Sequence, residues 1–148
     1  MAKIDAFGPH LTLDLNYCNP AKLNDYDLVF DVLNNLPDMI GMTKITQPYV
    51  FKYSGLVPED KGITGFVVIA ESHISIHTFQ DKEYCFVDLF SCKPFDYTFA
   101  EKYLIDVFES QKPTVNVIMR GHDFPRSEAL SGPANGIHTI NNGLVTAV

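Results

Sequence analysis

The chain has 148 residues, which is the size of one ordinary domain. Hydrophobic residues make up 46% of it and charged residues 20%, a globular composition rather than a disordered one. The net charge of −7 argues against a protein that binds the phosphate backbone of nucleic acid through a basic face. No apolar run reaches the roughly 18 residues of a membrane span, and the first residues alternate polar with apolar instead of forming a signal peptide. We therefore expect a soluble cytoplasmic protein that binds neither membranes nor nucleic acid.

The three cysteines, Cys18, Cys85 and Cys92, favour a reducing compartment. An odd number cannot pair completely within one chain, and no two of them form a CxxC motif. Most unpaired cysteines are small buried hydrophobic residues, so a chemical role for any one of them needs separate support.

The first predicted elements are a strand and a helix. Residues 10–15 alternate with period two, which indicates a strand. Asn19 followed by Pro20 is typical of a helix start, and the helix should end near Pro37. Apolar side chains at spacings of three and four then place one hydrophobic face on this helix: Leu23, Tyr26, Phe30 and Leu33.

The middle of the chain predicts a series of strands. Residues 45–53 are β-rich, and Pro48 within them suggests an edge strand or a bulge. Residues 65–70 form a continuous apolar run. Residues 73–79 alternate, and a polar turn separates them from the next strand at 84–91, so residues 73–91 read as a hairpin.

The last predicted elements are a second helix and a final strand. Asp96 could cap the helix, whose apolar side would carry Phe99, Tyr103, Leu104, Val107 and Phe108. Residues 115–119 are the strand. The order β-α-β-β-β-β-α-β predicts an α+β fold, with two helices on one face of a mainly antiparallel sheet. We assign residues 1–120 to one domain and residues 121–148, rich in Gly, Pro, Asn and Ser, to an irregular tail.

Residues 70–79 (AESHISIHTF) hold the densest group of reactive side chains. His73 and His77 are four residues apart, which on a helix would suggest a pair of metal ligands. On a strand, at roughly 3.3 Å per residue, they lie about 13 Å apart. That is too far to share one metal ion, so no metal site is expected.

Alternation sorts these side chains by face. His73, Ser75, His77 and Phe79 share one side of their strand. The following strand has its own shared side, made of Tyr84, Phe86, Asp88, Phe90 and Cys92. If the strands pair, a polar, reactive patch could cross the sheet. The residues alone favour a half-buried sheet whose histidines only satisfy hydrogen bonds, because no local motif here has a fixed mechanism.

The stretch GITGFVVIAESHISIHTF, followed by YCFVDLFSCKPFD, resembles the processing site and active-site region of the small prokaryotic S-adenosylmethionine decarboxylase proenzymes. The segment FGPHLTLDLNYCNPAKL is similar to the same family, so the likeness covers about residues 7–120. A Glu-Ser-His junction, a downstream His and a later Cys occur together in order and spacing. The resemblance implies a two-layer α/β sandwich that forms a homodimer with active sites near the dimer interface.

Self-cleavage between Glu71 and Ser72 is the first activity that the resemblance implies. It would give a β chain of residues 1–71 and an α chain of residues 72–148. The Ser72 hydroxyl would attack the preceding carbonyl, elimination would break the ester, and hydrolysis of the dehydroalanine would leave a pyruvoyl group. His77 matches the processing acid/base, and Thr64 stands where relatives carry a serine that assists processing.

The pyruvoyl group derived from Ser72 is the cofactor that the resemblance implies, with no metal. It would form a Schiff base with the substrate's α-amine and accept electrons as CO₂ leaves, as pyridoxal phosphate does. Cys92 matches the family's proton donor by position. Cys85 should point to the opposite face, and Cys18 should be structural.

The substrate implied is S-adenosylmethionine, and the product would be the aminopropyl donor for spermidine synthesis. Glu71 would lie near the cationic part of the substrate. Phe79 stands where many relatives have a tryptophan that stacks on adenine, and Asp81 stands where a glutamate commonly contacts the ribose. Either Tyr53 or Leu56 could supply the second wall of the adenine site.

Two other functions stay open at this point. The family includes members that decarboxylate arginine or ornithine with the same pyruvoyl chemistry, and a net charge of −7 suits any of these cationic substrates. The chain could also be an unprocessed paralogue that regulates a partner subunit. The joint presence of Ser72, His77 and Cys92 argues against a regulator, because a regulator needs none of them.

Overall fold

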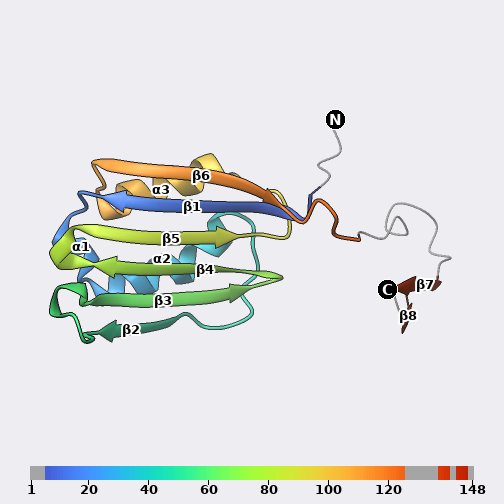
Figure 1. Cartoon of the computed structure of the whole chain (residues 1–148), viewed down its shortest axis with the longest axis horizontal. Helices are drawn as coiled ribbons and strands as arrows, with labels where there is room; N and C mark the ends of the chain where they lie inside the picture. The colour runs from blue at the N-terminus through green and yellow to red at the C-terminus, as the bar shows by residue number, and fades with distance from the viewer. Residues whose placement is uncertain (1–5, 126–136, 141–142, 147–148) are drawn as a thin grey trace.

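Six antiparallel strands form one sheet with the order β2-β3-β4-β5-β1-β6 (Figure 1). The computed structural model describes residues 6–125, 137–140 and 143–146. The strands of this sheet are β1 (Gly8–Asn16), β2 (Tyr49–Tyr53), β3 (Gly62–Ile69), β4 (Ser72–Phe79), β5 (Tyr84–Phe90) and β6 (Lys112–Arg120).

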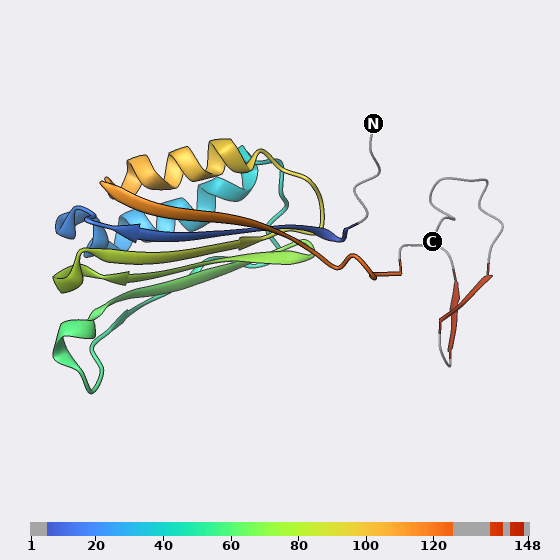
Figure 2. The same ribbon diagram turned by 45° about the horizontal axis from the view of Figure 1, so that its top comes forward.

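Two long helices, α2 (Tyr26–Met39) and α3 (Tyr97–Phe108), cover one face of the sheet (Figure 2). The shorter elements are a single helical turn, α1 (Pro20–Leu23), and the 3₁₀ turns η1 (Pro58–Asp60) and η2 (Gln80–Lys82). The predicted α+β class, with helices on one face of an antiparallel sheet, is confirmed. The opposite face has no helix over it in the described part of the chain, and we call it the open face.

The prediction of one unbroken helix from Pro20 to near Pro37 is wrong at its middle, although the helix does end near Pro37, at Met39. Asn19 does cap a helix, because its side chain accepts a hydrogen bond from the Ala21 N–H (2.9 Å), but that helix ends after one turn. Asp25 then starts α2 with a cap of its own, accepting from the Leu28 N–H (3.0 Å).

The second cap changes which side chains of the helix face the sheet. The buried residues of α2 are Val29, Val32, Leu33, Leu36 and Pro37. Tyr26, predicted on the apolar face, is exposed, and its hydroxyl donates to the Val50 carbonyl (3.2 Å). Pro37 lies within the last turn, and α2 continues to Met39.

The other predicted elements agree with the structure apart from their ends. Residues 73–91 do form a hairpin, in which Ser75 lies opposite Asp88. Of the predicted stretch 45–53 only Tyr49–Tyr53 is a strand, and β2 lies at the sheet edge. Asp96 caps α3, but Phe99 is 43% exposed and does not belong to the buried side of the helix.

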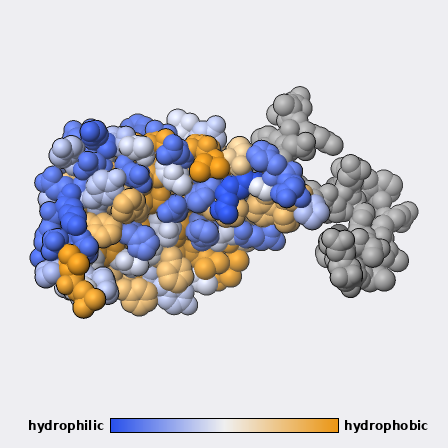
Figure 3. Space-filling model, viewed as in Figure 1, coloured by the Kyte–Doolittle hydropathy of each residue, from blue (hydrophilic) through white to orange (hydrophobic). Residues whose placement is uncertain are grey.

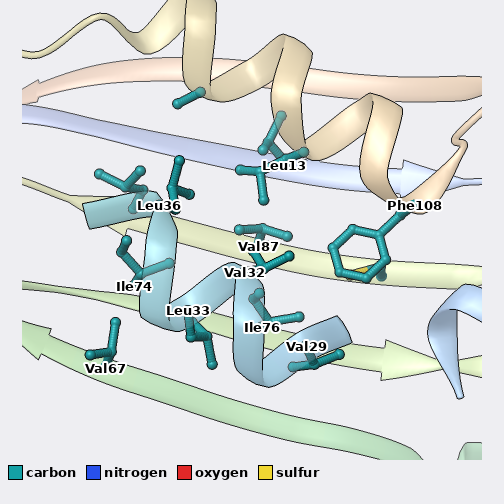
Figure 4. Close-up of a cluster of buried hydrophobic side chains, with 14 of the residues drawn as sticks. Leu13, Val29, Val32, Leu33, Leu36, Val67, Ile74, Ile76, Val87 and Phe108 are labelled. Atoms are coloured by element: carbon teal, nitrogen blue, oxygen red, sulfur yellow. The ribbon is translucent and has the colours of Figure 1, made fainter. Parts of the chain in front are cut away.

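A single hydrophobic core fills the space between the helices and the sheet. Figure 4 shows Val29, Val32, Leu33 and Leu36 of α2 beside sheet residues that include Val67, Ile74, Ile76 and Val87. On β4, Ser72, Ile74, Ile76 and Thr78 are buried on the helix side, while the alternate residues are less buried on the open face. The predicted sorting of β4 side chains by face is therefore confirmed.

The segment predicted to be an irregular tail contains two short strands in its described part. β7 (Ile137–Ile140) and β8 (Gly143–Thr146) pair antiparallel as a separate two-stranded sheet. Residues 121–125 have no helix or strand. The remainder of the predicted tail lies outside the described residues.

Candidate active site

Ser72 begins β4 and has its side chain buried, with 8% of the residue exposed. The backbone N–H of Cys92 donates to Ser72 Oγ at 2.8 Å. The Cys92 thiol lies on the other side of the same junction and donates to the Ala70 carbonyl at 3.7 Å. Glu71 is exposed and directly precedes Ser72. The structure thus brings Glu71, Ser72 and Cys92 together, and we call these three residues the cleavage cluster.

Thr64 and His77 face each other across β3 and β4. Their side chains lie on the open face, and Thr64 Oγ1 is 3.2 Å from His77 Nδ1. Either atom can supply the proton of this hydrogen bond, depending on the tautomer of the imidazole. A hydroxyl in contact with an imidazole is an arrangement that can move a proton.

Three of the four residues predicted to contact substrate lie near the end of β4, whereas the fourth, Glu71, directly precedes its start. Phe79 meets Phe86 edge to face, with ring centroids 5.8 Å apart. Asp81 forms an ion pair with Lys61, with 3.3 Å between Oδ2 and Nζ. Tyr53 lines a shallow hollow of about 220 Å³ that also contacts Lys61.

Leu56, the alternative to Tyr53 as the second wall of the adenine site, is fully exposed (102%). It lies in the connection between β2 and η1. Among the described residues, Tyr53 is therefore the better placed of the two to line a binding surface beside η2. We call Thr64, His77, Phe79, Asp81 and Tyr53 the histidine cluster.

The two clusters lie at opposite ends of β4. Ser72 and His77 are five residues apart on one extended strand, which corresponds to about 16 Å at roughly 3.3 Å per residue. Their side chains also leave the strand on different faces. One chain therefore does not bring His77 into contact with Ser72.

A charged group that the sequence did not predict lies on the open face. His10 Nε2 is 3.0 Å from Asp88 Oδ1, and Arg120 approaches His10 Nδ1 at 3.3 Å while covering the Phe90 ring at 4.3 Å. Burial lowers the pKa of the nearby His73, and the electrostatic effect of His10 lowers it further. Strand alternation could have placed His10 beside Asp88, but nothing in the sequence indicates the position of Arg120.

The other two cysteines are enclosed. Burial raises the pKa of Cys18 to about 11 and raises that of Cys85 well above its ordinary value. Cys92 is the most accessible of the three thiols. Cys85 is fully buried on the helix side of β5.

No described group of three or more His, Cys, Asp or Glu side chains could hold a metal ion. Within the same described ranges, no helix is long and apolar enough to cross a membrane. Sequence reasoning missed one contribution to the cleavage cluster, the main-chain N–H of Cys92. Residue spacing does not reveal a main-chain contact.

The fold is that of a known class of decarboxylase. The chain is similar to the crystal structure of the adenosylmethionine decarboxylase from Aquifex aeolicus VF5, with a TM-score of 0.67 and 25% identity over 78% of this chain and 92% of that one. It is 34% identical over 129 residues to the S-adenosylmethionine decarboxylase proenzyme of Thermodesulfovibrio yellowstonii, covering 84% of this chain and 89% of that protein. The proenzyme of Pyrococcus abyssi is 30% identical over 119 residues, covering 80% and 81%.

The family model for S-adenosylmethionine decarboxylase matches residues 9–121. The chain therefore belongs to the S-adenosylmethionine decarboxylase family. Its activity is that of the family, adenosylmethionine decarboxylation, which the sequence had left beside arginine and ornithine decarboxylation.

Proposed function

We propose that the chain cleaves itself between Glu71 and Ser72 and then uses the pyruvoyl group made from Ser72 to decarboxylate S-adenosylmethionine. The product is the aminopropyl donor for spermidine biosynthesis. Cleavage yields a β chain of residues 1–71 and an α chain of residues 72–148. The observation that carries the residue assignment is the hydrogen bond from the Cys92 N–H to Ser72 Oγ at 2.8 Å.

Cleavage uses bonds that the chain already contains. Ser72 Oγ attacks the carbonyl carbon of Glu71, so a C–O bond forms, the C–N bond breaks, and the Ser72 amine is freed. Removal of the Ser72 Cα proton then breaks the Cβ–Oγ bond and releases residue 71 as a carboxylate. Water hydrolyses the remaining dehydroalanine, ammonia leaves, and a keto group remains at residue 72.

The cleavage cluster supports the first of these steps. Because the Cys92 N–H donates to Ser72 Oγ, the oxygen is held at one position before it attacks. Ser72 is also nearly buried, so its hydroxyl exchanges few hydrogen bonds with water. Glu71 stays exposed beside it, where its carboxylate can face a cationic substrate.

In our proposal, His77 and Thr64 of one copy act on the Glu71–Ser72 junction of a second copy, which lies at the start of β4 and carries the exposed Glu71. The two clusters lie about 16 Å apart on one strand, so one chain cannot use both on the same bond. A twofold axis that runs across the strands reverses the direction of β4 in the second copy, so a dimer with this axis sets the end of one β4 over the start of the other.

Exposed aromatic side chains on and beside the open face support the homodimer. Tyr49 stacks on Phe66 at 5.3 Å, and both rings are exposed, as is Phe86 on β5. Figure 3 looks onto this face and shows hydrophobic side chains set among hydrophilic ones. An apolar surface of this kind is typical of a site where another protein packs.

The pyruvoyl group would supply the electron sink for decarboxylation. Its site fits this chain because the group is made from Ser72 itself, which is already buried beside a thiol. The Cys92 thiol is the proton donor to the substrate. Phe79 and Tyr53 contact the adenine and Asp81 contacts the ribose. The enzyme needs no metal and works in the cytoplasm.

Release of CO₂ from three carboxyl-labelled amino acids tests this function. We expect the purified protein to release label from S-adenosylmethionine and not from arginine or ornithine, and we expect Ser72→Ala to release none. Release from arginine or ornithine alone would overturn the substrate assignment. Undiminished release by Ser72→Ala would overturn the assignment of Ser72.

A further inference from the structure

Ser91 lies between the end of β5 and Cys92 and is fully buried, with 0% of it exposed. Its hydroxyl donates to the Lys93 carbonyl at 2.7 Å and accepts from the Lys93 N–H at 3.1 Å. Met42 Sδ lies 3.6 Å from the same oxygen. The Ser91 side chain thus spans Cys92 and forms hydrogen bonds with both main-chain groups of Lys93.

The backbone on either side of Cys92 is anchored to other elements. The Ser91 N–H donates to the Pro9 carbonyl at 3.0 Å. At Gly8 a Cβ would lie 1.8 Å from the Ser91 carbonyl oxygen, so β1 packs directly against this residue and only glycine fits there. Beyond Cys92, Lys93 Nζ donates to the Gly41 carbonyl at 2.8 Å.

Cys92 therefore lies between two anchored residues, Ser91 and Lys93, where it contacts the cleavage junction. Its N–H reaches Ser72 Oγ and its thiol reaches the Ala70 carbonyl. A rotation of this short loop would move both groups at once. The Ser91 hydroxyl is the side-chain group that closes the loop.

We propose that Ser91 is a positioning residue for self-cleavage, an inference that rests on the proposed function. Its hydroxyl keeps the Cys92 N–H on Ser72 Oγ while that oxygen attacks the preceding carbonyl. The same bridge holds the Cys92 thiol over the junction. Ser91 does not touch the reacting atoms and acts through the geometry of residues 92 and 93.

The chain offers a matched control in Ser110. This serine is also buried, and its hydroxyl donates to a main-chain carbonyl, that of Asn16, at 2.7 Å. Asn16 ends β1, whereas Ser91 pairs with Pro9 near the start of that strand, so Ser110 lies at the far end of the sheet from the cleavage cluster. Ser110→Ala removes the same kind of bond without touching the Cys92 loop.

The test measures the rate at which freshly synthesised chain splits, by denaturing electrophoresis and intact mass. We expect Ser91→Ala to split about 10- to 100-fold more slowly than wild type, since small displacements of reacting groups cost rate on this scale. Ser110→Ala should split at nearly the wild-type rate. Ser91→Thr, which keeps the hydroxyl, should restore most of the rate.

Thermal melting separates a positioning role from a purely structural one. If Ser91 only stabilised the fold, Ser91→Ala and Ser110→Ala would each lose cleavage rate in proportion to the decrease in melting temperature. If Ser91→Ala does not fold, Ser91→Thr and Ser91→Val give the comparison at nearly constant volume, with valine expected to be the slower. If wild type splits and Ser91→Ala splits at the same rate, the positioning role of Ser91 is wrong while the proposed function stands. Equal cleavage rates in Ser91→Thr and Ser91→Val would have the same meaning. An intact wild-type chain would overturn the proposed function and this inference with it.

Discussion

Ser72 begins the face of β4 that packs against the helices. The buried residues of that face after it are Ile74, Ile76 and Thr78. A hydroxyl on this side needs a hydrogen-bonding partner, because burying an unpaired one costs about 1–3 kcal/mol. The Cys92 main chain supplies that partner, so the reactive oxygen is both satisfied and oriented.

Ser72→Ala removes the attacking oxygen and should leave one intact chain. Ser75→Ala is the matched control, since Ser75 lies on the same strand but on the open face and away from the junction. Intact mass under denaturing conditions reads the result. Two fragments from Ser72→Ala would disprove the cleavage assignment, and so would a single intact chain from wild type.

Cys92→Ala should separate the two activities of the protein. The N–H that contacts Ser72 Oγ belongs to the main chain and survives the substitution, so the chain should still split. Decarboxylation should fall by about 100-fold or more, because the proton donor is lost. Electrophoresis and CO₂ release measure the two effects. Near-normal turnover would remove Cys92 as the donor.

Alkylation of the folded protein should modify Cys92 ahead of the other two thiols. Burial raises the pKa of Cys18 to about 11, against an ordinary value of 9.0, so at pH 8 that thiol stays protonated and unreactive. Cys85 is fully buried with a raised pKa and should behave alike. Peptide mass after iodoacetamide treatment, with urea-unfolded protein as the control, checks this. Equal labelling of all three in folded protein would contradict the burial described here.

Among the elements, the strands could be predicted because one face of each is buried, which makes apolar and polar residues alternate along the sequence. The break between α1 and α2 could not, because Asn19 and Asp25 both offer cap side chains and only packing on the sheet selects a restart at Tyr26. The prediction for Phe99 is wrong for a related reason. Its spacing fits the apolar side of α3, but the buried residues of the helix are Ala100, Leu104 and Phe108.

The packing of α2 on the sheet gives a prediction about stability. Leu33 is fully buried, so Leu33→Ala should lower the free energy of unfolding by about 2–5 kcal/mol. The same substitution at the exposed Leu56 should change it by less than about 0.5 kcal/mol. Denaturant unfolding measures both. Comparable losses in the two variants would contradict the core that α2 forms with the sheet.

The candidate site could be predicted only in part. Resemblance named Ser72, His77 and Cys92, and the structure brings Cys92 to Ser72. A strand advances about 3.3 Å per residue, so His73 and His77 are too far apart to share one metal ion. The same advance places Ser72 and His77 too far apart to be in contact. No pattern within one sequence says how two copies pack, so spacing alone could not resolve this separation.

For the whole molecule, the separation of the two clusters predicts complementation between inactive chains. Ser72→Ala and His77→Ala should each cleave poorly alone. In a mixed dimer, one site combines the intact Ser72 of one chain with the intact His77 of the other. Random mixing should restore about a quarter of wild-type sites, since half of the dimers are mixed and half of their sites are complete.

Co-expression of differently tagged chains tests this complementation. Cleavage should appear in the His77→Ala chain, which keeps Ser72, and never in the Ser72→Ala chain. No cleavage in purified mixed dimers would contradict a site shared between copies. Cleavage of His77→Ala alone at the wild-type rate would remove His77 from processing.

Self-cleavage and pyruvoyl chemistry at Ser72 are tested most directly by the intact mass, under denaturing conditions, of protein incubated with borohydride and S-adenosylmethionine, arginine or ornithine. We expect two fragments split after Glu71. The fragment that begins at residue 72 should lack a free amino terminus and should carry an adduct derived from S-adenosylmethionine alone. A single intact chain that traps no substrate would contradict both self-cleavage and the pyruvoyl group.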